Sequence, residues 1–192
     1  WAEGLTATEL AERTPEDLAG AALSLWEHAQ QRAPGQANVR VFNPRGLAAG
    51  WRSPYAVAEI VTDDMPFLVD SALGALTRLD LPMQTLVHPV LPVRRDAAGQ
   101  MQAIEAGGAP ESMMQIGFGP EADSAKLAEV AAALKRAMTD VRAAVGDFDA
   151  MAARLNEAVA ALPEGSAERE FLGWLAGENF VLTGFQANRN ST

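Results

Sequence analysis

The sequence has no cysteine, two histidines and no long apolar run. Without thiols the chain can form no disulfide, thiolate nucleophile or cysteine-based zinc site, and a reducing cytoplasm is the compartment we expect. No apolar segment approaches the roughly 18 residues that a membrane-spanning helix needs, and no signal peptide is visible. We therefore expect neither a membrane partner nor thiol chemistry.

Positive charge is also in short supply. The 192 residues carry 15 Lys and Arg against 25 Asp and Glu, a net charge of −10. Such a balance argues against a nucleic-acid partner, because no extended basic face is available to neutralise phosphates. With 48% apolar and 21% charged residues the chain is typical of a globular protein, long enough for one core and the edge of a second.

Helical segments are marked by their caps and by apolar residues at helical spacing. Thr14 followed by Pro15 and two acids predicts the start of a helix over residues 14–31. The same patterns predict helices over residues 65–80, 124–145 and 147–162, and a short helix that begins at Ser166 and is closed by Gly177.

Strands are predicted over residues 55–62, 84–93, 101–105 and 111–119, after an extended segment at 39–42. Pro89 and Pro92 lack the N–H that a β-ladder needs, so the second half of 84–93 is expected at a sheet edge or kinked. The last apolar run, residues 179–186, is expected to begin a following domain. Because the chain starts at Trp1 rather than Met and stops just after this run, we expect a piece of a longer protein.

The order strand, helix, strand, strand, strand, helix across the centre predicts an α+β sandwich of ferredoxin-like type, flanked by N- and C-terminal helices. We expect three parts. Residues 1–52 form an N-terminal helix and extended segment, residues 53–146 the α+β domain, and residues 147–192 a helical connector with the first strand of a following domain.

Two adjacent carboxylates, Asp63 and Asp64, stand where the first central strand meets its helix, in the stretch VTDDMPFLVDS. An acid at this place most often caps the helix start, which stabilises it by about 0.5–2 kcal/mol, and Pro66 suits a first turn. The alternatives are a catalytic acid/base pair and a metal site that includes Asp70. No HExxH, histidine cluster or glycine-rich phosphate loop supports the metal site.

The remaining candidates carry little chemistry. His28 and His88 each stand alone, and no Ser–His–Asp arrangement is readable around Ser71, Ser112 or Ser124. Arg94 and Arg95 are interpreted as a solvated hairpin tip, with an anion site as the alternative. The tryptophans at 26, 51 and 174 are interpreted as core anchors.

A junction of strand ends with a helix start favours a small anion, because the backbone N–H groups there are free. The two aspartates disfavour an anion unless they receive an ammonium group. An amino acid carries both groups, which leaves it open as a ligand class for this junction.

Several stretches resemble the N-terminal region of the large NAD-specific glutamate dehydrogenases of bacteria. They are ERTPEDLAGAALSLWEHAQ, RVFNPRGLAAGWRSPYAVAEIVTDDMPFLVDSALGAL, HPV and EFLGWLAGENFVLTGFQ, and together they cover nearly the whole chain. The block over residues 40–71 is the specific part of the resemblance.

This resemblance implies a parent enzyme several times longer that converts glutamate to 2-oxoglutarate and ammonia with NAD, and whose catalytic domain is absent from this chain. It also implies an ACT-like module, a small sandwich that in other enzymes binds amino acids as effectors. The effector would sit at Asp63, Asp64, Met65 and Phe67, where Met-Pro-Phe replaces the Pro-Gly of many ACT domains and leaves less room for a close backbone approach.

The leading hypothesis is therefore a non-catalytic regulatory domain without a cofactor of its own. We expect backbone N–H groups to hold the carboxylate of an amino acid, and Asp63 to hold its ammonium. Its other expected partners are the downstream domains and further copies of the same chain. The alternatives are a purely structural oligomerisation or interdomain module, and a stand-alone metal-dependent enzyme that uses Asp63, Asp64 and Asp70.

Overall fold

The computed structural model describes residues 13–46, 50–120, 122–179 and 182–184, together with Leu5 and Leu10. Contacts between Cα atoms divide the chain into two compact units, residues 1–139 and 140–192. The elements of the first unit are α2 (Pro15–Ala29), β1 (Asn38–Phe42), β2 (Arg45–Gly46), β3 (Trp51–Arg52), β4 (Ala56–Asp63), α3 (Leu68–Thr77), β5 (Met83–Val87), β6 (Val90–Arg95), β7 (Met101–Ile104), β8 (Ala109–Phe118) and most of α4 (Ser124–Gly146).

The main sheet is antiparallel and has the strand order β1-β4-β8-β6-β7, with β5 also paired to β8. Both β4 and β5 run antiparallel to β8, so they are parallel to each other, with β8 between them and α3 as the crossover. This arrangement confirms the α+β sandwich. The predicted N-terminal segment, residues 1–52, contributes α2 and the edge strand β1.

The predicted strand over residues 84–93 is interrupted at His88 and Pro89, which separate β5 from β6. The two pieces lie beside one partner: β6 pairs the first part of β8 and β5 pairs its last part. The kink expected from the prolines is confirmed, because a residue without an N–H interrupts the ladder at that point.

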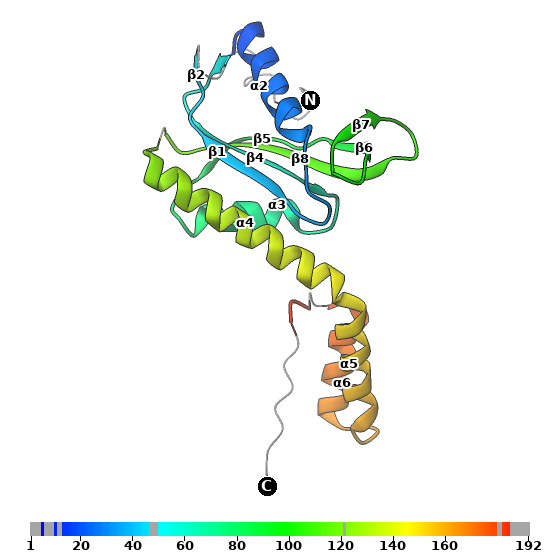
Figure 1. The fold of residues 1–192 in the computed structure, drawn as a ribbon. Helices are drawn as coiled ribbons and strands as arrows, with labels where there is room; N and C mark the ends of the chain where they lie inside the picture. Colours follow the sequence, from blue (N-terminus) through cyan, green and yellow to red (C-terminus); the bar gives the residue numbers. More distant parts are fainter. Residues whose placement is uncertain are drawn as a thin grey trace. The chain divides into compact units, whose positions relative to one another are not determined.

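Helices cover both faces of the sheet (Figure 1), and most side chains of β4 and β8 are buried on both. The face toward α3 and α4 is apolar, since alternate residues along β4 and β8 place Ile60, Met114, Ile116 and Phe118 there, all with no exposed surface. Burial of apolar surface stabilises such a layer, by about 25 cal/mol for each Å² removed from water.

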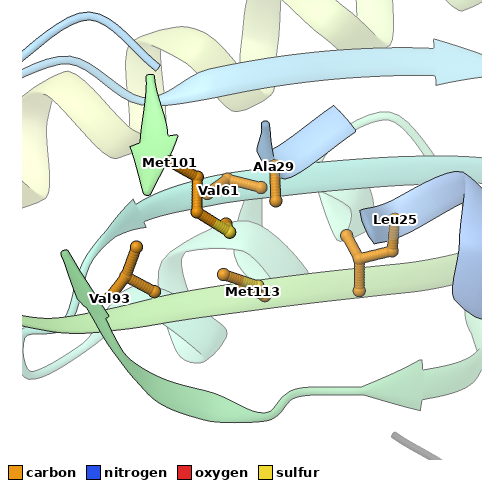
Figure 2. Close-up of a cluster of buried hydrophobic side chains, with 6 residues drawn as sticks. All are labelled: Leu25, Ala29, Val61, Val93, Met101 and Met113. Carbon is orange, nitrogen blue, oxygen red and sulfur yellow. The ribbon is translucent and has the colours of Figure 1, made fainter. Parts of the chain in front are cut away.

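The face toward α2 combines apolar and polar side chains. Figure 2 shows its apolar cluster, in which Leu25 and Ala29 of α2 lie over side chains of the sheet, namely Val61, Val93, Met101 and Met113. A second cluster joins Ala21 to Trp51 and Val57. Trp51 is 3% exposed and is a core anchor as predicted. Trp26 and Trp174 are 44% and 51% exposed, so that interpretation was wrong for them.

Helix α2 begins as predicted, because the side chain of Thr14 accepts a hydrogen bond from the backbone N–H of Asp17 at 3.1 Å. Helix α3 begins later than predicted, at Leu68 instead of residue 65, and ends at Thr77. Its N-cap residue is Phe67, in a left-handed conformation with φ 69° and without a side-chain capping bond. The expectation that Asp63 or Asp64 caps this helix was therefore wrong.

The described part of the second unit contains the end of α4, then α5 (Phe148–Ala161), α6 (Ala167–Trp174) and a π-helical turn (Leu175–Asn179). Ser166 caps α6 as expected, whereas Gly177 lies within the π-helical turn and does not close α6. Of the expected strand over residues 179–186, the first residue lies in this turn and Leu182–Gly184 has no regular structure. Its other residues lie outside the described residues.

Candidate functional site

The loop between β4 and α3 carries the residues predicted to bind an effector. Asp64 is exposed, and its backbone N–H donates to the carbonyl oxygen of Pro110 at 3.0 Å, which anchors the loop to β8. Phe67 is 48% exposed despite its size, and its positive φ is a conformation that costs an L-residue about 1 kcal/mol or more. The loop therefore presents a carboxylate and an aromatic ring to solvent beside the first turn of α3.

Asp63 ends β4 and faces α2. Its Oδ1 accepts a hydrogen bond from Nη2 of Arg32 at 2.6 Å, and its side chain is 37% exposed. The carboxylate is thus reached from solvent on one side and neutralised by a guanidinium on the other.

The pair formed by Arg32 and Asp63 continues into a buried cluster. Nη2 of Arg32 also donates to Oε1 of Glu111 at 2.8 Å, and Arg95 grips Glu111 with two parallel bonds, from Nε to Oε1 and from Nη2 to Oε2, each 2.7 Å. The side chains of Arg32, Glu111 and Arg95 are 5%, 2% and 10% exposed. Two guanidiniums and two carboxylates balance in charge, as the burial of ions requires.

Arg95 also binds the C-terminal end of α2. Its Nη2 donates to the carbonyl oxygen of Ala29 at 2.8 Å, and its Nη1 to those of Gly99 at 2.9 Å and Gln30 at 3.3 Å. A cation at this place satisfies carbonyl groups that the helix leaves unpaired and complements its negative end. The prediction of a solvated hairpin tip holds for the exposed Arg94 and was wrong for Arg95.

The electrostatics of the cluster follow from its hydrogen bonds. Burial by itself would raise the pKa of Glu111, but the bonds from Arg95 and Arg32 outweigh it and hold that pKa below its ordinary 4.5. Burial likewise opposes the charge of Arg32, yet the bonds to Glu111 and Asp63 raise its pKa. Glu111 and Arg32 therefore both stay charged at neutral pH.

A second polar cluster lies under the middle of α2, at Ser24. It centres on Glu59, which has no exposed surface. Its Oε1 accepts from Ser24 and from Gln115, each at 2.8 Å, and Nε of Arg40 donates to Oε2 at 2.6 Å. We did not predict this cluster. The available signal was a charged residue in the middle of an otherwise buried strand, because such a residue needs a partner.

The interruption between β5 and β6 places His88 beside Ser112, with 2.6 Å between Nε2 and Oγ. Burial lowers the pKa of His88 below its ordinary 6.5, and the nearby charge of Asp64 opposes that shift. The structure thus brings together a serine and a histidine that the sequence kept apart. Ser112 has no exposed surface, so it cannot attack a substrate and the pair is structural.

Within the described residues, no three histidine, aspartate or glutamate side chains gather as metal ligands. Asp63, Asp64 and Asp70 therefore do not form the cation site considered above. The helices in that part of the chain are also too short or too polar to cross a membrane.

Comparison with known proteins agrees with this geometry. The family model "Glutamate dehydrogenase, ACT1 domain" matches residues 2–134. This chain belongs to that family. The match ends inside α4, so it takes in the whole sheet, the loop at Asp63–Phe67 and both polar clusters of the ACT1 domain.

Three relatives of this ACT1 domain are NAD-specific glutamate dehydrogenases. The proteins from Halomonas elongata and Pseudomonas aeruginosa are 35% and 31% identical over 92% and 93% of the chain, and the protein from Mycobacterium tuberculosis is 28% identical over 90% of it. The chain spans 12%, 12% and 11% of their lengths. The resemblance inferred from the sequence is confirmed.

We predict that Glu111→Gln lowers the free energy of unfolding by about 3–5 kcal/mol, because two buried guanidiniums then face a neutral amide. The matched control is Glu105→Gln, which removes the partner of Arg94 in a pair about half exposed, and we expect less than about 1 kcal/mol from it. Urea unfolding monitored by tryptophan fluorescence measures both. Equal losses in the two variants would show that the buried cluster contributes no more than a surface pair.

We predict that His88 makes the domain less stable as the pH falls from about 7.5 to about 5. Its folded pKa is lowered, so the unfolded chain takes up the proton first and stability is lost below the ordinary pKa of 6.5. Thermal unfolding across this range should show a flatter decline in His88→Gln than in the wild type.

His28 needs a separate control, because burial and the neighbouring Arg40 lower its pKa as well. The variant His28→Gln should keep the contribution of His88. An unchanged decline in His88→Gln would mean that its folded pKa is not lowered.

Proposed function

We propose that this ACT1 domain is a regulatory, non-catalytic part of an NAD-dependent glutamate dehydrogenase, an enzyme that converts L-glutamate to 2-oxoglutarate and ammonia. The observation that carries the proposal is the family match over the sheet and its helices, with relatives that are NAD-specific glutamate dehydrogenases. Because the chain spans about an eighth of those proteins, we assign NAD binding and catalysis to other parts of the enzyme. A cytoplasmic location stays a prediction.

We further propose that the domain senses a free amino acid at the loop formed by Asp63, Asp64, Met65 and Phe67. Three features support this ligand class. The carboxylate of Asp63 is partly exposed and suits an ammonium, the backbone N–H groups of the first turn of α3 suit a carboxylate, and Phe67 offers an exposed ring to a side chain.

Calorimetric titration of the chain with a panel of free amino acids, glutamate and aspartate included, tests this proposal. We expect saturable binding of at least one, weakened at least about tenfold in Asp63→Ala, because a charged hydrogen bond contributes about 1.5–3 kcal/mol. The control is Asp149→Ala, an exposed aspartate in the first turn of α5. Silence across the panel from a folded chain, or equal loss in both variants, would contradict amino-acid sensing at this loop.

The second candidate is a structural module for assembly, alone or with other domains of the enzyme. The observation that favours it is a pair of stacked rings on α6, Phe171 and Trp174, with centroids 6.4 Å apart. These rings are 59% and 51% exposed, and Phe148 of α5 is 44% exposed. Aromatic side chains exposed to this degree are typical of interaction sites.

Light scattering on the isolated chain tests self-assembly through this aromatic pair. We expect a mass above that of the monomer, which Trp174→Ala returns to the monomer because the substitution removes the larger ring from the interface. Trp26→Ala, at a tryptophan of similar exposure on α2, should leave the mass unchanged. A monomeric wild-type chain would contradict self-assembly and leave contacts with other domains of the enzyme as the structural role.

A further inference from the structure

The partly exposed aspartate of the proposed ligand loop is also the outermost member of the buried ion cluster. Asp63 is 37% exposed, whereas the side chain of its partner Arg32 is 5% exposed. A ligand that approaches from solvent therefore meets the carboxylate first and cannot reach the guanidinium. A ligand that displaces the Asp63 carboxylate therefore weakens its ion pair with Arg32.

The guanidinium of Arg32 is not fully hydrogen-bonded. Its Nη1 donates to the carbonyl oxygen of Gln36 at 3.1 Å, and its Nη2 serves both Asp63 and Glu111. Its Nε is buried without a hydrogen-bond partner. A group that is already under-satisfied loses a large share of its stabilisation when one carboxylate withdraws.

Two sets of hydrogen bonds connect Arg32 with the C-terminal end of α2. Through Glu111 the first set reaches Arg95, whose guanidinium holds the carbonyl oxygen of Ala29. Through the backbone, the N–H of Arg32 donates to the carbonyl oxygen of Gly99 at 3.0 Å, and the N–H of Met101 donates to that of Gln30 at 2.8 Å. These bonds tie the segment after α2 to the β6–β7 hairpin.

Helix α2 depends on such polar bonds more than α3 does. Its buried residues are Ala21, Ser24, Leu25 and Ala29, which include one large apolar side chain, whereas α3 buries two leucines with two alanines. Apolar burial contributes in proportion to area, so the polar bonds carry a larger share of the docking of α2. A change in the ion cluster therefore has a substantial effect on the end of this helix.

We propose that Arg32 couples the loop to α2, so that a ligand ammonium that draws the Asp63 carboxylate toward solvent loosens the C-terminal end of α2. Withdrawal of Asp63 leaves two guanidiniums to share Glu111, and the buried cluster then carries an excess positive charge. The inference deepens the proposed function, because the ligand it requires is the amino acid proposed to bind there. Occupancy of the loop would thus be read out at α2, on the opposite face of the sheet from α3 (Figure 1).

Hydrogen exchange at single amides, followed by NMR on the whole chain without ligand, tests the coupling. The reporting amides are those of Arg32 and Met101, and the reference is the amide of Arg78, which bonds to Gly74 at the end of α3. We expect Asp63→Asn to accelerate exchange at the two reporters about tenfold and to leave the reference unchanged. Asp149→Asn, at an exposed aspartate in the first turn of α5, is the control and should leave all three amides unchanged.

Arg32→Lys provides a second variant, because lysine keeps the charge but cannot serve both carboxylates from a rigid fork. It should accelerate the same two amides. Equal exchange in Asp63→Asn and Asp149→Asn would overturn the coupling. So would acceleration at the reference amide to the same extent, because that result indicates global destabilisation.

The ligand half of the proposal is tested by adding the amino acid that binds in the titration. Faster exchange at Arg32 and Met101 in its presence supports the coupling. Binding without any change at these amides would overturn it and leave amino-acid sensing intact. If no amino acid binds, the proposed function and the ligand half fail together, and Asp63→Asn still decides whether the loop and α2 are linked.

Discussion

The carboxylate of Glu111, held between Arg32 and Arg95, is the contact through which three parts of the domain meet. Arg32 follows α2, Arg95 ends β6, and Glu111 itself lies in β8, which pairs β4, β5 and β6. A buried ion pair adds little net stability, because the Coulomb energy mainly offsets desolvation. Its main effect is to fix the relative positions of the two side chains. When one partner moves away, the other is left as a buried charge whose desolvation, several kcal/mol, is no longer offset.

The two faces of the sheet are consequently stabilised in different ways. The face under α3 and α4 is apolar, and its cohesion is non-directional and tolerant of small shifts. The face under α2 contains Glu59 and Glu111 with their guanidinium partners, whose bonds depend on direction and distance. The proposed response to a ligand is for that reason placed at α2.

The loop at Asp63–Phe67 lies at the end of β4, where the apolar and the polar face of the sheet meet. Alternation along β4 places Thr62 on the apolar face and Asp63 on the polar face, and the chain then turns into α3 through the strained residue Phe67. Asp63 is partly exposed, Asp64 and the ring of Phe67 are exposed, and α3 begins without a side-chain cap. The family match adds that such a module occurs within glutamate dehydrogenases.

Most of the secondary structure could be predicted from the sequence, because its signals are local. Thr14 and Ser166 cap their helices, Pro89 interrupts its strand, and apolar periodicity indicated the long helix α4. The errors arose where a local pattern had two explanations. The acids before α3 have the pattern of an N-cap. The chain makes one more turn after them, however, so the N-cap residue of α3 is Phe67.

The sequence by itself determined the fold class, the lack of thiol chemistry and the family, since these depend on composition, on periodicity and on a contiguous pattern of residues. Only the tertiary structure decided which charges are buried and which partners they have. Arg94 and Arg95 are adjacent and identical in sequence terms, yet one is solvated and the other caps α2. Partners separated by many residues, such as Arg32 and Glu111, meet because strand pairing brings them together, and no local signal encodes that contact.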